Sequence, residues 1–369
     1  MTSIVKHKKK ILMKKKGSSL AIAILLLLVL SITVVAIMMV SQTENNTEIF
    51  QNRRTQAYYL AWSGANSVGD WIIKNPASAI ALVGKSSTNS SSFSNGEVTV
   101  EVKADVAMKL LIKGTGIVKG VSNTANLRLE KLNSSQMLDR AIYSNAPLDI
   151  TGMNISGDVQ SGGNINYSSN GSNTFSGVPY PYEERFFELA AFPSPPVYGT
   201  GIINLKKTDQ AISVSGSFTS IDVENQANLN LNPNGVMKIV VDNMNIDGNL
   251  NIDGVNGRVE LYINNSLTVT TKGFINNEDG NPNDLVIFLK KDSMFYMQAN
   301  KILSAYVIGP EATMQIQSAQ STTNGALITN IIRKNAQGQG PNGAINYIPP
   351  DASLDIHSIL ISYRIFQWE

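Results

Sequence analysis

The sequence predicts an α+β protein with a long N-terminal helix, a small antiparallel β-meander and a mainly-β domain of the right-handed solenoid type. Three observations support this. An uncharged run from Ser18 to Val40 follows a cluster of lysines. Strictly alternating strand patterns begin at Glu97, and short apolar strands recur at a roughly constant interval beyond Ala211.

These patterns divide the chain into four segments. They are a basic leader (1–17), a helix with a membrane span at its start (18–76, span 18–40), a linker with a small β-meander (77–135) and a solenoid-like domain (136–369).

The N-terminus has the pattern of a membrane anchor. Seven lysines and no acid precede the apolar run, at positions 6, 8, 9, 10, 14, 15 and 16. The 23 residues from Ser18 to Val40 contain no charge, proline or glycine. A helix of that length covers about 35 Å, enough to cross a bilayer. A secretory signal peptide has a shorter apolar core and a small-residue cleavage site, whereas a signal anchor with a cytoplasmic N-terminus fits the length.

The helical pattern continues beyond the span. Apolar residues recur at three- and four-residue steps and form one stripe, which consists of Tyr58, Ala61, Trp62, Ala65, Val68 and Ile72. Asn75-Pro76 ends the helix, because proline disfavours helix in the residue before it. The stripe is expected to pack on the protein's own globular part, and residues 18–50 on neighbouring helices.

The run Lys14-Lys15-Lys16-Gly17-Ser18 and the helix behind it resemble the class III leader of type IV pilins and pseudopilins. In that family a prepilin peptidase cuts after the glycine, and the apolar segment becomes the mature N-terminus. The resemblance implies a cut between Gly17 and Ser18, a single-pass stage in the inner or cytoplasmic membrane, and contacts with other pilins at the cell surface.

One position departs from the major-pilin pattern. The fifth mature residue is Ile22, where that family carries a glutamate that neutralises the neighbouring subunit's N-terminal amine. PilX-type minor pilins and the tip pseudopilin lack it, and the segment from Gln51 to Gly64 is similar to the PilX N-terminal family. The resemblance therefore implies a minor pilin, in a tip or priming position of a type IV pilus or a related secretion pseudopilus, whose head serves adhesion or assembly.

Composition excludes several classes of site. The chain has no cysteine, which excludes disulfides, thiolate metal sites and cysteine nucleophiles. Its only histidines are His7 and His357, so histidine-based catalysis has almost no material. Without the leader lysines, 23 basic residues face 28 acidic ones, a net charge of −5. The basic balance belongs to the leader and gives no support for nucleic-acid binding.

Strand patterns follow a polar stretch. Ala77–Gly96 is rich in serine and is expected to be a loop. Alternating or apolar runs at 97–103, 110–120 and 125–130, separated by turns, predict an antiparallel meander that packs on the stripe of the helix.

Beyond residue 141, Asn, Gly, Ser and Asp punctuate short apolar runs. The apolar centres Val240, Leu261, Ile287, Val307 and Ile328 lie 21, 26, 20 and 21 residues apart. This spacing favours a β-solenoid, in which stacked rungs share one core, over a β-sandwich. The rung texture also resembles domains that follow PilX-like N-termini.

Two segments interrupt or end this pattern. The proline-rich insertion 178–196 is expected to hold one or two helical turns, and its aromatic residues to anchor it to the solenoid wall. These are Tyr180, Tyr182, Phe186, Phe187 and Phe192. Ser353–Phe366 is expected to form a last strand or a cap on an open end of the solenoid.

Candidate chemistry is sparse. Asp279, Asn281 and Asn283 alternate as calcium ligands do, but the sixth position is Asp284 and the twelfth is Lys290, where a calcium loop needs glycine and glutamate. A solvated turn is therefore the expectation for Asp279–Asp284.

Carboxylates on one solenoid face, such as Asp242, Glu260 and Asp292, suggest a polysaccharide-degrading enzyme only weakly, because nothing in their spacing singles them out. We expect no enzyme and no cofactor. The alternative function is a signal-anchored surface protein whose solenoid binds polysaccharide, with no pilus involved.

Overall fold

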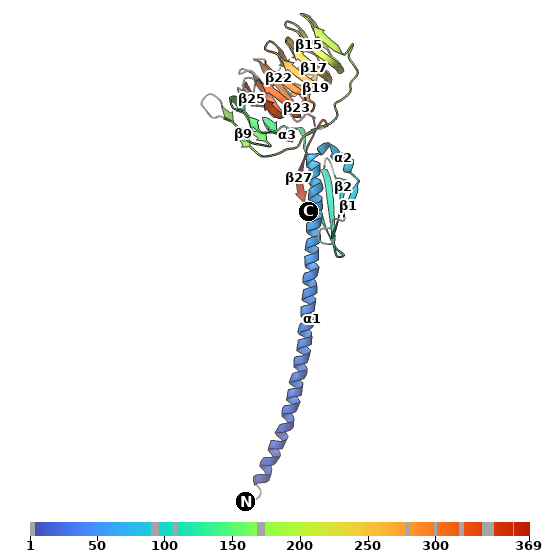
Figure 1. Cartoon of the computed structure of the whole chain (residues 1–369), viewed down its shortest axis with the longest axis vertical. Helices are drawn as coiled ribbons and strands as arrows, with labels where there is room; N and C mark the ends of the chain where they lie inside the picture. The colour runs from blue at the N-terminus through green and yellow to red at the C-terminus, as the bar shows by residue number, and fades with distance from the viewer. Residues whose placement is uncertain are drawn as a thin grey trace.

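The computed structural model describes residues 4–89, 96–105, 109–167, 174–277, 280–298, 301–316, 321–333, 343–356 and 358–369. The molecule is elongated: a single long helix carries a small sheet beside its C-terminal half and a β-solenoid head beyond its end (Figure 1). The predicted fold class, α+β with a β-solenoid, is confirmed. The handedness of the solenoid stays a prediction.

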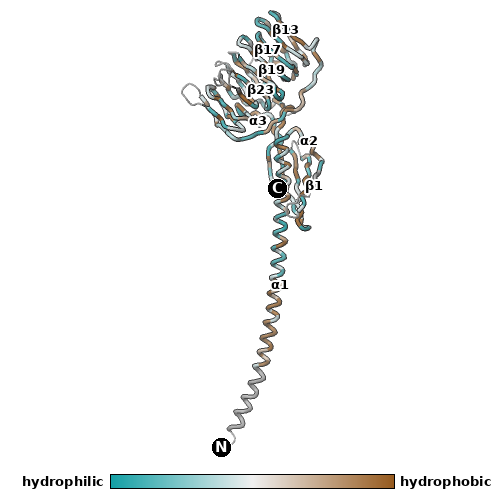
Figure 2. Tube along the Cα trace, in the orientation of Figure 1, coloured by the Kyte–Doolittle hydropathy of each residue, from teal (hydrophilic) through white to brown (hydrophobic). Residues whose placement is uncertain are grey.

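Helix α1 (Ile4–Lys74) is 71 residues long. It ends where predicted, since Pro76 opens the 3₁₀ helix η1 (Pro76–Ser78) after Asn75. Its backbone begins earlier than predicted, because the leader is part of the same helix. The large apolar side chains of the span are all exposed, from 49% at Val34 to 67% at Leu27. The hydrophobic part of α1 therefore projects away from the rest of the protein, as Figure 2 shows.

The predicted meander is confirmed. Strands β2 (Gly96–Ala104), β3 (Lys109–Val118) and β4 (Val121–Lys131) pair antiparallel in sequence order. The loop predicted for Ala77–Gly96 is wrong in part, because the described residues form α2 (Ala79–Leu82) and β1 (Ser86–Asn89). β1 has little apolar pattern and forms as the edge partner of β2, so pairing with a neighbour decides its conformation.

Small residues set the contact between α1 and this sheet. Ala57, Ala61 and Ala65 are fully buried against β3. A Cβ atom on Gly114 would lie 2.1 Å from the Ala61 carbonyl oxygen, and one on Gly116 would lie 2.1 Å from that of Ala57. The helix backbone thus rests directly on the strand, and only glycine fits there.

The predicted stripe is correct at its centre and wrong at its margin. Ala61, Ala65 and Ile72 are fully buried, and Val68 is half-buried. Tyr58 and Trp62 remain 38% and 39% exposed, because the closeness of helix and sheet leaves room only for small side chains on the contact line.

The head consists of short parallel strands. These are β5 (Ile142–Ser144), β6 (Leu148–Asp149), β7 (Met153–Ser156), β8 (Val159–Ser161), β9 (Ile165–Asn166), β10 (Phe175–Ser176), β11 (Pro179–Tyr180), β13 (Ile202–Leu205), β14 (Asp209–Ile212), β15 (Gly216–Val223), β16 (Asn228–Leu231), β17 (Gly235–Ile246), β18 (Asn249–Ile252), β19 (Gly257–Val269), β20 (Phe274–Asn277), β21 (Leu285–Leu289), β22 (Met294–Met297), β23 (Ile302–Ile316), β24 (Thr322–Arg333) and β25 (Gly343–Tyr347). A sandwich would pair its strands antiparallel, so parallel pairing throughout these described strands rules out that alternative.

The rungs do not stack in sequence order. β13, β15, β17, β19, β21, β23 and β24 follow one another along the main sheet, but β24 is then joined by β5, and β5 by β8. The first strands of the head therefore lie at the end where the last ones finish. The chain must cross the whole stack between β11 and β13, and we call the crossing segment, residues 181–201, the strap.

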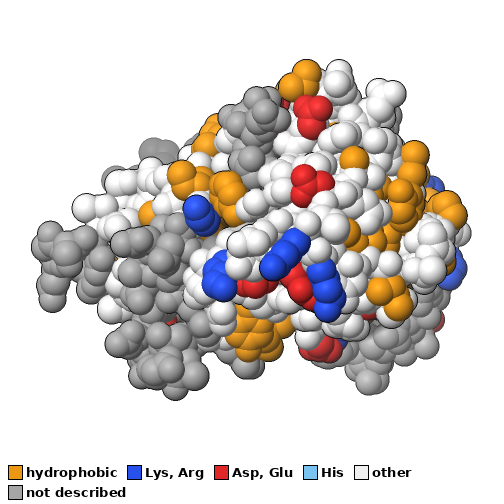
Figure 3. All heavy atoms as spheres, turned by 90° about the horizontal axis from the view of Figure 1, so that it is seen from above, with side chains coloured by type: hydrophobic (Ala, Val, Ile, Leu, Met, Phe, Trp, Pro, Cys, Tyr) orange, Lys and Arg blue, Asp and Glu red, His pale blue; other side chains and the backbone are white. Residues whose placement is uncertain are grey.

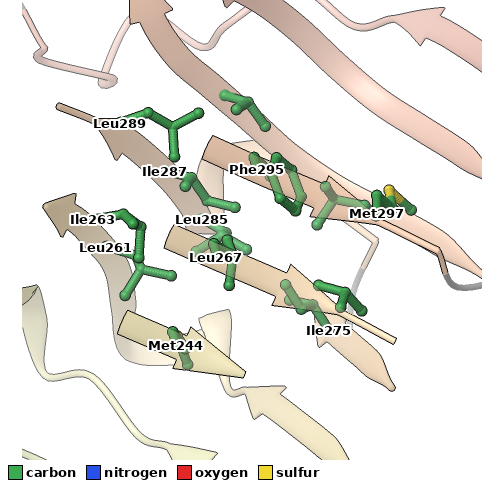
Figure 4. Close-up of a cluster of buried hydrophobic side chains, with 14 of the residues drawn as sticks. Met244, Leu261, Ile263, Leu267, Ile275, Leu285, Ile287, Leu289, Phe295 and Met297 are labelled. Carbon is green, nitrogen blue, oxygen red and sulfur yellow. The ribbon is translucent and has the colours of Figure 1, made fainter. Parts of the chain in front are cut away.

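Inward side chains of all rungs form one narrow core (Figure 4). Of the predicted apolar centres, Leu261, Ile287 and Val307 pair in register on three successive strands and point inward. Val240 and Ile328 are one residue out of register, because Val240 pairs with Tyr262 and Val307 with Leu327. Both faces of these strands are apolar, so the sequence does not reveal which face a residue occupies.

The C-terminus returns to the helix. β26 (Leu360–Ile361) pairs with β12 (Glu188–Leu189) in the strap, and β27 (Tyr363–Trp368) pairs antiparallel with β4 as the outer strand of the small sheet. The predicted last strand is therefore present, but it belongs to the small sheet, so the alternative of a cap on an end of the solenoid is wrong. Ile361 and Tyr363 instead join the core beneath α1.

The glycine contact predicts a local loss of stability. Gly116→Ala places a methyl group against the Ala57 carbonyl and should lower the free energy of unfolding of the helix–sheet unit by about 1–3 kcal/mol, the usual cost of overpacking. All three tryptophans, Trp62, Trp71 and Trp368, lie in this unit, so tryptophan fluorescence during urea unfolding measures it alone. Lys113→Ala, at an exposed position of β3, is the control and should change the midpoint little.

Candidate functional sites on the helix and the head

The N-terminal site is the uncharged stretch of α1 from Ser18 to Val40. The peptide bond between Gly17 and Ser18 lies within α1, and Ile22 is 57% exposed on its surface. The first acidic residue of the chain is Glu44, so no carboxylate is available near the predicted mature N-terminus. Within the described residues, α1 is the one helix long and apolar enough to cross a membrane.

Hydroxyl groups inside the span are satisfied by the helix itself. Ser31 Oγ donates a hydrogen bond to the Leu28 carbonyl over 2.8 Å, and Thr33 Oγ1 donates to the Val29 carbonyl over 2.6 Å. In hydrocarbon, an unpaired hydroxyl would be costly. The polar atoms of the span therefore do not prevent its burial in lipid or between other helices.

The strap is extended, so the predicted helical turns are wrong. Pro181, Pro193, Pro195 and Pro196 restrict its backbone to extended conformations and remove hydrogen-bond donors. The interpretation of its aromatics as anchors is confirmed for two of them. The Phe187 ring packs 5.3 Å from that of Tyr143, and the Phe192 ring packs 5.0 Å from that of Tyr262.

The other aromatic residues of the insertion differ. Tyr182 is 72% exposed, and Phe186 is half-buried. The guanidinium of Arg140 lies 4.3 Å from the centre of the Tyr180 ring, and Arg140 also pairs with Asp158 over 2.7 Å. The strand just before the strap is thus fixed by a cation on an aromatic face, and the middle of the strap by buried rings.

Beneath the strap, the solenoid has a second apolar layer on its outer face. Tyr262, Phe288 and Tyr306 are fully buried there. The Tyr262 hydroxyl donates to Glu260 Oε2 over 2.7 Å, and Glu260 also pairs with Arg258 over 2.9 Å. Burial, and then the hydrogen bond to Glu260, raises the pKa of Tyr262 above its ordinary value. Glu260 is therefore part of a buried structural cluster.

A cleft of about 640 Å³ opens where this apolar layer ends. One wall is the strap, with Phe192 and Pro193, and the other is the outer edge of the main sheet, with Asp242, Asn264 and Lys290. The Asn264 amide nitrogen donates to Asp242 Oδ1 over 2.8 Å. Lys291 Nζ pairs with Glu311 over 3.0 Å at the rim.

The three carboxylates considered from the sequence do not meet in this cleft. Asp242 lines it, whereas Glu260 is 4% exposed beneath the strap and paired with Arg258. Asp292 occupies a left-handed turn with φ 62° and is not among the lining residues. The sequence missed Asn264 and Lys290, whose proximity to Asp242 depends on the strand register.

The segment Asp279–Asp284, for which a solvated turn is expected, falls partly outside the described residues, because Asp279 is not among them. Asn281, which precedes the 3₁₀ helix η3 (Pro282–Asp284), accepts hydrogen bonds from the backbone and side-chain amides of Asn283. Its own amide donates to Asp284 Oδ1 over 3.2 Å. Across the described part of the chain, no group of three or more His, Asp or Glu side chains is placed to hold a metal ion.

Seen from above, the head shows a few basic and acidic side chains close together near the middle of an otherwise largely uncharged surface (Figure 3). Among the described residues on this face, the charges are mixed and no broad basic patch is visible. A nucleic-acid-binding surface would need a concentrated positive charge.

If the buried rings anchor the strap, two aromatic substitutions in this segment should differ in their effect on the stability of the head. Phe187→Ala removes a ring that is 7% exposed and should destabilise the head by about 3 kcal/mol. Tyr182→Ala removes a ring that is 72% exposed and should leave stability unchanged. Calorimetry of the full chain measures both, and the head transition is the one that tryptophan fluorescence does not report. Equal effects of the two substitutions would contradict the anchoring role.

Comparison with known protein families finds a match for part of the chain. Residues 204–347 match the model of a family described as a domain of unknown function (DUF7305). That segment runs from β13 to β25, the part of the solenoid wound in sequence order. No curated protein matches the chain.

Among solved structures, the competence-associated pilin ComZ from Thermus thermophilus matches over 86% of this chain and 97% of its own. The identity is 10% and the TM-score 0.25. A TM-score this low does not establish a shared fold or a shared function.

Proposed function

We propose that this chain is a minor pilin or pilin-like structural subunit, without enzymatic activity, of a type IV pilus or a related secretion pseudopilus. One observation carries the proposal: α1 has two halves in different surroundings. From Ala57 onward its small residues are buried in the protein's own sheet, whereas from Leu20 to Val40 every large apolar side chain is exposed. Such a surface requires lipid or neighbouring helices, and a pilin uses both in turn.

The basic leader supports an order in which the helix lies first in the membrane and then among other helices. Lysines before Gly17 favour a cytoplasmic N-terminus, and removal of the leader by a prepilin peptidase would free the uncharged helix at Ser18. The span would then leave the bilayer of the inner or cytoplasmic membrane and pack among the helices of other pilins. The head would stand at the cell surface, where it serves adhesion or assembly.

Two features favour a tip or priming position over the filament body. Ile22 supplies no carboxylate for the amine of a neighbouring subunit, and the first acid lies as far along as Glu44. The head is also wider than the helix–sheet unit on which it stands (Figure 1). A wide head at every position would interfere with the close lateral packing of helices.

A second function remains in competition, since the same helix would also anchor a surface protein that assembles into nothing. N-terminal sequencing of the protein from membranes separates the two. With the prepilin peptidase present, the mature chain should begin at Ser18. Without the enzyme, or with Gly17→Leu, it should begin at Met1. A start at Met1 with the peptidase present, or a cut after Ala36, would contradict the pilin proposal and favour the signal-anchored alternative.

A further inference from the structure

The cleft beside the strap is lined by a column of polar residues from four successive rungs. Phe218 pairs with Val241, Val241 with Ile263, and Ile263 with Leu289. The register shifts just after this position, between Val241 and Asn243, so the residues that follow are adjacent on successive rungs but are not paired one to one. These residues are Thr219, Asp242, Asn264 and Lys290, and all four line the cleft.

Strand alternation explains why this column is open. Val240, Tyr262 and Phe288 point outward two residues earlier and are buried in the apolar layer under the strap. The residues between the two columns point into the solenoid core. The next outward position lies in the cleft, which Phe192 and Pro193 of the strap line from the other side. The polar groups thus face solvent across from an aromatic and proline-lined wall.

The column has a regular spacing. Neighbouring strands lie about 4.8 Å apart, so four rungs present hydrogen-bonding groups over about 14 Å along the solenoid axis. An extended peptide repeats its like-facing side chains every 6.6–6.8 Å or so and would lose register with these groups.

The groups also define the polarity of a ligand. Asn264 donates to one oxygen of Asp242, which leaves the other Asp242 oxygen and the Asn264 carbonyl as acceptors. Thr219 supplies a hydroxyl, and Lys290 an ammonium group that has no ion pair among the described residues. The lining holds three carboxylates and two ammonium groups, a net charge of −1, with Glu188, Glu311 and Lys291 as the remaining charged members.

We propose that the cleft binds a neutral oligosaccharide, extended along the solenoid axis, with Asp242 and Asn264 as the central hydrogen-bonding pair. Sugar hydroxyls both donate and accept, as this mixed column requires, and the apolar face of a ring packs on Phe192. A strongly anionic chain would meet the three carboxylates. The site does not depend on leader cleavage or on a pilus.

Calorimetric titration of the full chain, in a detergent without a sugar headgroup, tests the proposal. The neutral probes are maltohexaose, cellohexaose and the hexamer of N-acetylglucosamine, and hexagalacturonate is the anionic probe. At least one neutral probe should bind saturably and at least tenfold more tightly than hexagalacturonate. Asp242→Ala and Asn264→Ala should each weaken that binding at least tenfold.

The matched control is Asn251→Ala, which removes an amide from the hydrogen-bonded ladder on the other sheet, where Asn251 donates to Asn230 over 2.7 Å. It should leave affinity unchanged. Asp242→Asn keeps the shape of the side chain and distinguishes loss of the charge from loss of the fold. The proposal is overturned if no neutral probe binds, if hexagalacturonate binds more tightly, or if Asn251→Ala weakens binding as much as Asn264→Ala does.

Discussion

The exposed apolar surface of α1 is the constraint on which the rest of the molecule depends. Covering one Leu, Ile or Val side chain is worth about 1.5–3 kcal/mol, and the projecting helix carries a continuous run of them on all sides. Nothing else in the described chain covers this surface. The protein is therefore stable in only two kinds of surroundings, a bilayer or a bundle of other apolar helices, and its remaining structure holds the head at the far end of that helix.

Three connections attach the head to the helix and the small sheet. β4 leads into the head through α3 (Ser134–Met137), and β27 brings the C-terminus back to pair with β4. Between them, Glu188 in the strap accepts a hydrogen bond from the Ala77 backbone over 2.9 Å at the end of α1. Because the chain both enters and leaves through the small sheet, the solenoid is tied to the helix at neighbouring points.

Local patterns in the sequence were sufficient for the elements that depend on near neighbours. The charge-free run, the Asn75-Pro76 end of α1 and the alternating strands around Val98 and Ile112 all took the predicted form. The repeat spacing gave the existence of the rungs but not the face of each residue, since Leu261 and Ile287 share a register position and Val240 does not.

Features that depend on distant partners were not predictable. Short strands near Ile142 resemble those near Leu327, so the sequence does not show that β5 stacks on β24. Tyr58 and Trp62 look more suited to a core than Ala57, yet the close approach of Gly116 favours the alanine. Asp242 was a candidate from the sequence because it is a carboxylate. Asn264 and Lys290 were not, because only the folded structure places them beside it.

We propose that α1 leaves the membrane and packs at the end of a filament. The chain has no cysteine, so Val255→Cys, at a position 75% exposed on the head, gives a single attachment point for a maleimide-linked gold particle. Electron microscopy of sheared filaments then locates the head directly. We expect the gold particles at the ends of the filaments. Gold along the whole length would contradict the tip position, and gold confined to the cell envelope would contradict assembly into a filament.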